Sequence, residues 1–424
     1  FTAIPRIWKV DEIGGDIPTV EVSIPTSIVR TAAPPDGRYL MFISATGVFD
    51  PTADYRVMTE TGGNLFADYD FDGTEYITFG WAPERTFERS IYFDAADGNY
   101  IDVEDHLDIN PSGFTISSWI MRDSNSTNKS ILSKRPTSFT EGYDFKINNS
   151  NEFEVSWYNS GGTIQTLTSS EEIPLNEWHH LAVIYDGTDA TLYIDGVPDG
   201  IPTAKDPPVA AVDNSNSFFI GAAGKNSPTA FFDGNIDEVR VWNIALSIDQ
   251  LRFIMNQEIL ANSDLTPKVI GKYFNDRSIT PTKNDLVTIP WADLAGYYPM
   301  STYTYTNTKD ESGKGNQGAL KNLKTVDWQT APLPYISAQD GDWNTNASWT
   351  NGDVQTIPGA TALADNTVTV DWNIVRTAHI ITMDNSSLPA GNNGNRSVLG
   401  LFVDSNELTL TGDNSSGTGN GLTV

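Results

Sequence analysis

The stretch DYDFDGTEY, at residues 68–76, sets oxygen-bearing side chains at every second position and carries Asp-Gly in its middle. A calcium loop between two helices requires carboxylates at its first, third and fifth positions, glycine at the sixth and glutamate at the twelfth. The aspartates and the glycine fit, but Phe79 occupies the twelfth position. The alternation of the aspartates with Tyr69 and Phe71 is also typical of a half-buried strand entering a tight turn. We therefore predict a β-hairpin here rather than a calcium loop.

A second pair of carboxylates lies in EFEVSWYN, where Glu152 and Glu154 are two residues apart. This spacing puts both groups on one face of a strand, as a pair flanking a glycosidic bond would need, yet the solvated face of any strand has the same pattern. The sequence contains no Glu-x-Asp-x-x-Glu run, and its four histidines form no His-Glu-x-x-His motif. No Gly-x-Ser-x-Gly motif occurs either. We assign no catalytic residue and predict that the chain is not an enzyme.

The composition limits the partners of the chain. It has 424 residues, enough for two to four domains, and a formal net charge of -29. Such a charge repels nucleic acid and anionic membrane surfaces. No apolar run approaches the roughly 20 residues of a membrane span, and the absence of cysteine excludes disulfides and thiolate metal sites. We expect neither nucleic-acid binding nor membrane insertion, and we expect the chain to be part of a longer protein.

Short runs of β-branched and aromatic residues, separated by Gly, Asn, Asp and Pro, extend along the whole chain and predict an all-β fold. One segment, ALSIDQLRFIMNQEIL, has the pattern of a helix. Ser247 and Gln250 predict a capping box, and Leu251 and Met255 contribute to an apolar face. We expect this helix to pack on the sandwich that precedes it.

Six segments occur in order between Ser90 and about Leu251: SIYFDAADGNYIDV, FTISSWI, SILSK, NEWHHLAVIYDGTDATLYIDGV, FFIGAA and FFDGNIDEVRVWNIALSIDQL. Together they resemble a laminin-G-like jelly roll of the concanavalin A type. In FTISSWI, Phe114 and Ile116 alternate with Thr115 and Trp119, as the two faces of a sandwich strand require. The resemblance implies a jelly roll with a C-terminal helix over residues 90–262.

The remaining segments give weaker indications. Residues 1–89 contain the alternating runs RIWKV, TVEVSIP, YLMFIS, YRVMT and EYITFG, and with them resemble a small β-sandwich repeat of giant Bacteroidetes surface proteins. Residues 263–335 include a segment similar to the opening of another jelly roll, and we interpret them as a connector or partial module. Residues 336–424 resemble the first turns of a β-solenoid. The predicted architecture is therefore a series of tandem β-sandwich domains followed by the start of a solenoid.

The jelly-roll resemblance also implies a calcium site. Related domains hold a structural calcium ion between the first strand and an aspartate of the last strand, and the matching positions are Asp94, Asp97 and Asp237. Carboxylates and backbone carbonyls are suitable ligands for this hard cation. Acidic residues beside glycine turns are, however, ordinary in a chain this acidic, and the sequence allows either interpretation.

Sugar binding would need an exposed aromatic ring, because sugar rings stack their C–H faces on aromatic side chains. Trp157 and Tyr158 are neighbours on one predicted strand and therefore point to opposite faces, so one of them should face outward. Tyr143 is a further candidate. The competing interpretation is that these rings fill the core, as aromatic rings usually do.

The family resemblance implies a non-catalytic segment of a giant adhesin on the bacterial cell surface, exported by type IX secretion and in some cases serving gliding motility. Its partners would be an extracellular glycan or another surface ligand, and the secretion or gliding machinery. The first alternative is a carbohydrate-binding appendage of a secreted polysaccharide-degrading enzyme. The second is a spacer without a ligand.

Overall fold

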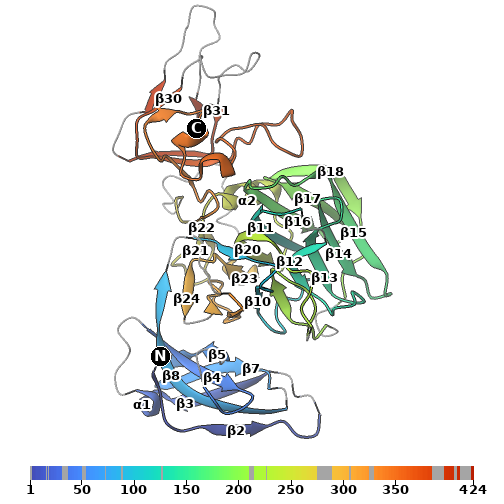
Figure 1. Ribbon diagram of the computed structural model, residues 1–424, viewed down its shortest axis with the longest axis vertical. Helices are drawn as coiled ribbons and strands as arrows, with labels where there is room; N and C mark the ends of the chain where they lie inside the picture. Colours follow the sequence, from blue (N-terminus) through green and yellow to red (C-terminus); the bar gives the residue numbers. More distant parts are fainter. Residues whose placement is uncertain are drawn as a thin grey trace, which may run out of the picture.

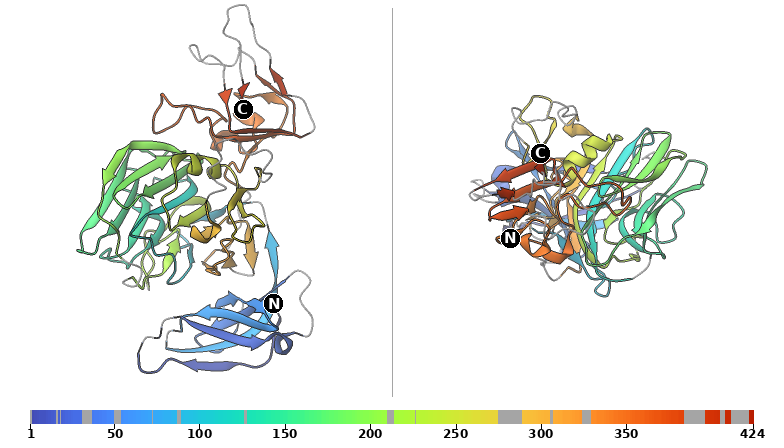
Figure 2. Two further views of the ribbon diagram at one scale, coloured as in Figure 1. Left: turned by 180° about the vertical axis from the view of Figure 1, so that it is seen from behind. Right: turned by 90° about the horizontal axis from the view of Figure 1, so that it is seen from above.

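The regular secondary structure of the computed structural model is almost entirely β, and the molecule divides into three parts along its longest axis (Figure 1). An N-terminal sandwich lies at one end, a larger jelly roll in the middle and a segment of parallel strands at the other end (Figure 2). In the part of the chain that the structure describes, no helix is both long and apolar enough to cross a membrane. The structure describes residues 2–15, 17, 19–30, 37–49, 54–71, 73–86, 89–125, 128–209, 214–225, 227–274, 289–304, 307–323, 329–383, 396–404, 408–410 and 422–424.

The N-terminal sandwich packs two sheets around a core that includes Leu65 and Phe79. In one sheet, β8 pairs with β1, β2 and β4, and β4 also pairs with β5; in the other, β7 lies between β3 and β6. The elements are β1 (Thr2–Ala3), β2 (Trp8–Asp11), β3 (Val20–Pro25), α1 (Thr26–Val29), β4 (Gly37–Ser44), β5 (Asp54–Val57), β6 (Thr59–Thr61), β7 (Asn64–Tyr69) and β8 (Thr74–Thr86).

The hairpin predicted for residues 68–76 is wrong. The strands on either side of the turn, β7 and β8, belong to different sheets, so the chain crosses here from one layer of the sandwich to the other. Tyr69 and Phe71 pack edge to face, with ring centroids 4.7 Å apart, and both are buried in the core between the sheets. Gly73 turns the chain with a φ of +78°, and its N–H donates to the carboxylate of Glu12. The turn at residues 68–76 therefore connects the two sheets of the sandwich and not two neighbouring strands of one sheet.

The jelly roll has two facing sheets. The first runs β15-β14-β13-β12-β19-β10-β26 and the second runs β18-β17-β16-β11-β20-β23, with β9 also on β20. Their strands are β9 (Ile91–Phe93), β10 (Tyr100–Asp102), β11 (Phe114–Arg122), β12 (Lys129–Lys134), β13 (Tyr143–Ile147), β14 (Glu152–Tyr158), β15 (Ile164–Glu172), β16 (His179–Tyr185), β17 (Asp189–Ile194), β18 (Val197–Ala204), β19 (Phe218–Ile220), β20 (Gly234–Trp242), β23 (Leu294–Tyr298) and β26 (Gly318–Lys321).

Strand β11 shows why the sequence alternates as it does. Phe114 and Ile116 point into the core between the two sheets, whereas Trp119 belongs to a second apolar cluster on the outer face. All nine residues of β11 are buried, because the helix α2 and the C-terminal segment cover that outer face. The predicted two-faced strand is confirmed, and neither face meets solvent.

The segment expected to be a connector or partial module contributes to both sheets of this jelly roll. Strand β23 pairs with β20 in the second sheet, and β26 pairs with β10 in the first. Between them, β24 (Thr302–Thr304) pairs with the end of β8 and with β25 (Asn307–Thr308), which joins the N-terminal sandwich to the jelly roll. The buried Asn307 reinforces this junction, because its backbone N–H donates to the Tyr55 hydroxyl over 2.7 Å. The segment also contains β22 (Val269–Gly271), which pairs with β21 (Ile259–Ala261) just before it, and η3 (Trp291–Asp293).

The C-terminal segment is built from parallel strands stacked in layers, the arrangement expected of a β-solenoid. Tyr335 pairs with Val375, and Val375 pairs with Leu401 in the next layer. Trp343 and Trp349 pack edge to face inside, with ring centroids 5.1 Å apart. The elements are β27 (Tyr335–Ile336), β28 (Gly341–Asp342), η4 (Asn346–Ser348), η5 (Gly352–Val354), β29 (Ile374–Thr377), β30 (Ile381–Met383), β31 (Arg396–Ser397), β32 (Gly400–Val403), β33 (Leu408–Leu410) and β34 (Leu422–Thr423).

The predicted helix is α2 (Ile248–Met255), and its capping box is confirmed. The Ser247 side chain accepts from the Gln250 N–H, and the Gln250 side chain accepts from the Ser247 N–H. Leu251 packs against β16, and Met255 joins the cluster around Trp119. The helix therefore lies on the outer face of the second sheet, as expected.

A bulge in β20 puts charged side chains beneath this helix. Opposite Ser117 and Trp119 of β11, the chain fits one extra residue, and Glu238 adopts a φ of +52°. The bulge allows Ile236 and Val239 to stay in the core while the carboxylates of Asp237 and Glu238 both reach the outer face.

Arg240, on the same face, is fully buried. Its guanidinium forms an ion pair with Glu238 and donates hydrogen bonds to the carbonyls of Ile254 and Gln257, each over 2.7 Å. These carbonyls lie at the end of α2, where a cation is favoured by the helix dipole. The Tyr297 hydroxyl donates to both oxygens of Glu238 over 3.1 Å. One buried arginine therefore connects β20, the helix and, through Glu238, β23.

We expect Arg240→Ala to destabilise the jelly roll by roughly 3–5 kcal/mol, because it leaves the buried Glu238 carboxylate without its charged partner and two carbonyls without their donor. Chemical denaturation of the full chain, followed through the jelly-roll transition, measures the effect. Lys9→Ala is the control, since Lys9 forms an exposed ion pair with Asp11 and should not move the midpoint. Equal midpoints for Arg240→Ala and wild type would contradict this role of Arg240.

Candidate functional site

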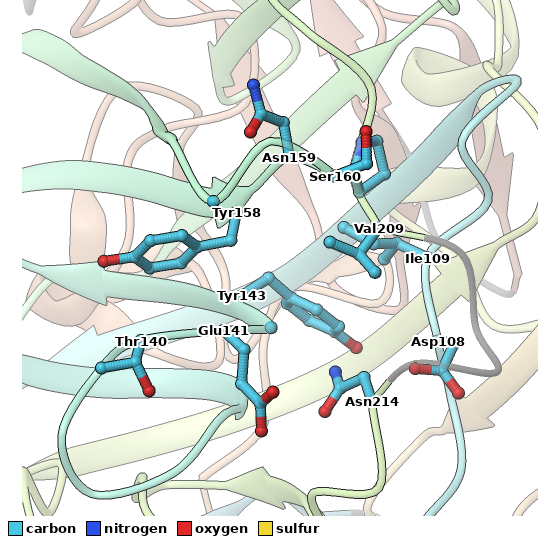
Figure 3. Close-up of a pocket in the computed structure, with 13 residues that line it drawn as sticks. Asp108, Ile109, Thr140, Glu141, Tyr143, Tyr158, Asn159, Ser160, Val209 and Asn214 are labelled. Atoms are coloured by element: carbon cyan, nitrogen blue, oxygen red, sulfur yellow. The ribbon is translucent and has the colours of Figure 1, made fainter.

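The candidate site is a cavity of about 340 Å³ at one end of the first sheet, near the start of β13 and the end of β14. Tyr143 and Tyr158 come from these two strands. Residues between β10 and β11, before β13, after β14 and after β18 form the rest of the described lining. Figure 3 shows Tyr143 between Tyr158 on one side and Asp108 on the other. The volume lies within the range of small-molecule pockets, about 300–1,000 Å³.

The ring of Tyr158 is held in place by neighbours that do not line the cavity. Its hydroxyl donates to the Phe139 carbonyl over 3.1 Å, and the two rings pack edge to face with centroids 5.2 Å apart. The guanidinium of Arg135 lies over the Phe139 ring and pairs with the buried carboxylate of Asp144 over 2.7 Å. Asp144, Arg135 and Phe139 therefore form a continuous set of contacts that fixes the half-buried Tyr158 ring at the pocket wall.

Lys134 organises the opposite wall from below. Its side chain is fully buried, and its ammonium group lies 2.5 Å from a carboxylate oxygen of Asp105 and 3.4 Å from one of Asp108. It also donates to the carbonyls of Asn214 and Asn216, over 2.9 and 2.7 Å. Burial raises the pKa of Asp108 to about 6, even though Lys134 acts in the opposite direction.

Amide side chains determine the shape of the rim. The Asn214 side-chain oxygen accepts from the Asn216 amide over 2.8 Å, and the same amide donates to Glu141 over 2.7 Å. On the other side, Asn159 closes its own turn by accepting from the N–H of Thr163 over 2.8 Å. The pocket thus offers one aromatic ring, two carboxylates and two amides, which suit a ligand rich in hydroxyl groups.

The structure separates the three predicted aromatic residues. Trp157 is wrong as a binding platform, because it is fully buried between Phe114 and Tyr185 in the core. Tyr143 is also buried, with its hydroxyl donating to the Leu107 carbonyl over 2.6 Å, and it forms part of the cavity floor. Tyr158 points to the other face of β14 and lines the cavity. The predicted alternation of Trp157 and Tyr158 between the two faces of β14 is confirmed. Because Trp157 is buried, Tyr158 is the ring of this pair that a ligand could contact.

The predicted calcium ligands do not come together. Asp94 directly follows β9, and Phe93 of that strand pairs with Gly234 of β20. The residue opposite Asp94 is therefore Asp233 rather than Asp237. Its carboxylate accepts from the N–H of Ala96 over 2.8 Å, within its own turn. Asp237 lies further along β20, is 1% exposed and accepts from the Ala331 N–H over 3.0 Å. Among the described residues, no group of three or more His, Asp or Glu side chains is placed to hold a metal ion.

Glu152 and Glu154 do lie on one face of β14, as their spacing predicted. The Asn148 amide contacts both carboxylates, and Lys146 pairs with Glu154 over 3.0 Å. Neither glutamate lines the cavity described above. Their partners make them members of a polar surface network, in keeping with the interpretation favoured from the sequence.

The carboxylates and amides of the pocket were not predicted: Asp108, Glu141, Asn159 and Asn214. Two of them adjoin predicted residues, since Glu141 precedes Tyr143 by two positions and Asn159 follows Tyr158. Polar residues next to strand ends were a usable signal for these two. Asp108 and Asn214 come from distant loops, and the fold alone brings them to the site.

Comparison with known proteins agrees with this architecture. Residues 94–252 match the concanavalin A-like lectin/glucanases superfamily, so this part of the chain is a concanavalin A-like jelly-roll domain. No curated protein sequence matches the chain.

Three similar solved structures come from bacteria. A Bacteroides ovatus protein, provisionally named as carbohydrate binding, is 15% identical, with 75% of this chain and 96% of that chain covered and a TM-score of 0.36. The NanB sialidase of Streptococcus pneumoniae, as its K499G mutant, is 15% identical over 43% of this chain and 30% of that chain, with a TM-score of 0.34. The CBM40 of Ruminococcus gnavus IT-sialidase, bound to α2,3 sialyllactose, is 14% identical over 40% of this chain and 95% of that chain, with a TM-score of 0.32.

The raised pKa of Asp108 predicts a pH dependence of stability. Because the folded-state pKa of about 6 exceeds the ordinary value of 3.8, the folded protein holds this proton more tightly than the unfolded chain. The resulting stabilisation is complete below pH 3.8 and is lost as the pH rises through about 6. Asp108→Asn cannot titrate, so its stability relative to wild type should increase between pH 4 and 7, measured by melting curves at about four pH values. A variant that instead loses stability at pH 7 would mean that the ion pair with Lys134 outweighs burial.

The buried position of Asp237 predicts that its carboxylate is not a calcium ligand. Because its carboxylate is buried and bonded to Ala331, Asp237→Asn should leave unchanged any shift in melting temperature that calcium or a chelator produces. Melting curves of wild type and variant, each with calcium and with chelator, make the comparison. A calcium shift that is present in wild type and lost in Asp237→Asn would restore Asp237 as a ligand.

Proposed function

We propose that the jelly-roll domain binds an extracellular glycan in the cavity beside Tyr158, and that the chain is a non-catalytic segment of a larger secreted protein. The observation that carries this proposal is the cavity itself, with a fixed, half-buried aromatic ring next to two carboxylates and two amides. A sugar ring needs an aromatic face for its C–H groups and hydrogen-bonding side chains for its hydroxyls. The superfamily to which residues 94–252 belong includes lectins, which supports this choice of ligand.

The rigidity of the site supports binding. The Tyr158 ring is restrained by Phe139 and Arg135, and the backbone carbonyls of Asn214 and Asn216 are held by the buried Lys134. A site ordered before the ligand arrives avoids the entropy cost of fixing side chains on binding. A non-catalytic role fits the carboxylates Glu152 and Glu154, which lie outside the cavity and are engaged by Asn148.

For the parent protein we propose an adhesin on the bacterial cell surface, exported by type IX secretion and serving attachment or gliding. The succession of β-domains with a net charge of -29 supports an extended, soluble surface segment. Structural calcium remains part of this proposal, tested by the melting curves described above. The alternative is a carbohydrate-binding appendage of a polysaccharide-degrading enzyme. Further β repeats and a sorting domain in the complete gene would favour the adhesin, whereas a hydrolase or lyase domain would favour the appendage.

We expect Tyr158→Ala to weaken glycan binding by roughly tenfold, because it removes the aromatic face while the buried floor remains. A glycan array identifies the ligands of the full chain, and calorimetry with the best of them measures the loss. Tyr76→Ala is the matched control, since Tyr76 is a half-buried tyrosine of the N-terminal sandwich and lies outside the cavity.

Two results would contradict the proposal. Wild-type protein that binds nothing on the array, with and without calcium, would favour the spacer function. Unchanged affinity in Tyr158→Ala would place the glycan elsewhere on the chain.

A further inference from the structure

The charges around the glycan cavity are one-sided. The described residues that line it include the carboxylates Asp108 and Glu141, and none of these lining residues is lysine, arginine or histidine. The other lining side chains are neutral: tyrosines, amides, hydroxyls and small apolar groups. A ligand in this cavity therefore meets negative charge and no accessible positive charge among the described lining residues.

The nearby cations are already used within the protein. Lys134 is fully buried, and its ammonium group is surrounded by Asp105, Asp108 and the two loop carbonyls. Arg135 pairs with the buried Asp144 and lies over the Phe139 ring. Neither cation belongs to the lining of the cavity, so neither is placed to receive an acid group of a ligand.

The carboxylates are only partly compensated. Asp108 lies 3.4 Å from Lys134, a longer separation than the 2.5 Å between Lys134 and Asp105. Burial still raises the pKa of Asp108 despite this neighbour, which means that its negative charge is poorly solvated. Glu141 receives one hydrogen bond from the neutral Asn216 amide. A cationic group in the cavity would relieve these charges, and an anionic group would add to their repulsion.

We propose that the site selects sugars by charge, binding rings with a free ammonium group best, neutral rings less well and rings with an acid group least. The selection rests on the glycan-binding function proposed above and specifies its ligand class as amino or neutral sugars. Each step in the series changes the ligand charge by one unit beside the same carboxylates. Such a change corresponds to roughly tenfold in affinity at low salt in a half-buried site.

The test uses a glycan array with amino, neutral and acidic members of several ring types, at about pH 7 and low ionic strength. For the ring type bound best, methyl glycosides of the amino, neutral and uronic acid forms are then titrated by ligand-observed NMR. We expect affinity to fall roughly tenfold from amino to neutral sugar and again from neutral to acidic sugar. Raising the salt to about 0.5 M should reduce these differences, because salt screens partly exposed charges.

The carboxylate variants show whether the two side chains cause the selection. Asp108→Asn/Glu141→Gln should bring the three affinities to within about threefold of one another. Glu141→Gln alone should give an intermediate result, and it keeps the test valid if the double variant does not fold. Glu152→Gln is the control, because it removes one negative charge from β14 outside the cavity and should leave the order unchanged.

The outcomes are distinguishable. Binding that is strongest for acidic sugars overturns the charge selection while the glycan-binding function stands. A preference for amino sugars that persists unchanged in the double variant also overturns it, because another part of the chain would then cause the preference. No binding to any member of the array overturns the proposed function and the charge selection together.

Discussion

The guanidinium of Arg240 is the contact on which the outer face of the jelly roll depends. It is fully buried beneath helix α2, where it binds Glu238 and the two carbonyls at the end of that helix. A buried ion pair contributes to stability only when nearly all its hydrogen-bonding groups are satisfied, because desolvation of the charges is costly. The bulge at Glu238 meets this condition by bringing the carboxylate to the outer face, where Tyr297 also donates to it.

The consequences extend to the C-terminal segment. Asn256 follows the helix directly and donates to the Pro332 carbonyl over 2.8 Å, and Asn373 donates to Asn256 over 2.7 Å. The carboxylate of Asp237 accepts from Ala331 in the same connecting stretch. The residues that fix the helix thus also fix where the parallel strands begin, and this explains why both faces of β11 are buried.

The same use of buried cations recurs at the candidate cavity and at the junction with the N-terminal sandwich. Lys134 contacts the Asn214 carbonyl and the carboxylates of Asp105 and Asp108, and Arg56 pairs with Glu104 across the junction between the two parts. In a chain with 26 basic and 55 acidic residues, several cations are committed to interior positions. The surface and the cavity are left with the excess of carboxylates, which gives the candidate site its chemical character.

The sequence by itself determined the all-β fold and the capped helix, because strand alternation and capping depend on residues close together in the chain. The jelly roll from Ser90 onward was indicated by the resemblance of six ordered segments to a known family. It also indicated that Trp157 and Tyr158 point to opposite faces. The tertiary structure decided that Tyr158 lines the cavity, that the turn at Gly73 joins two sheets, and that β23 and β26 belong to the jelly roll. Only the tertiary structure brings Asp108 and Asn214 close to Tyr158 and keeps Asp94 apart from Asp237. Both results depend on which strands pair and where a bulge shifts their register. The residues concerned are far apart in the chain, so no local sequence pattern indicates whether they come together.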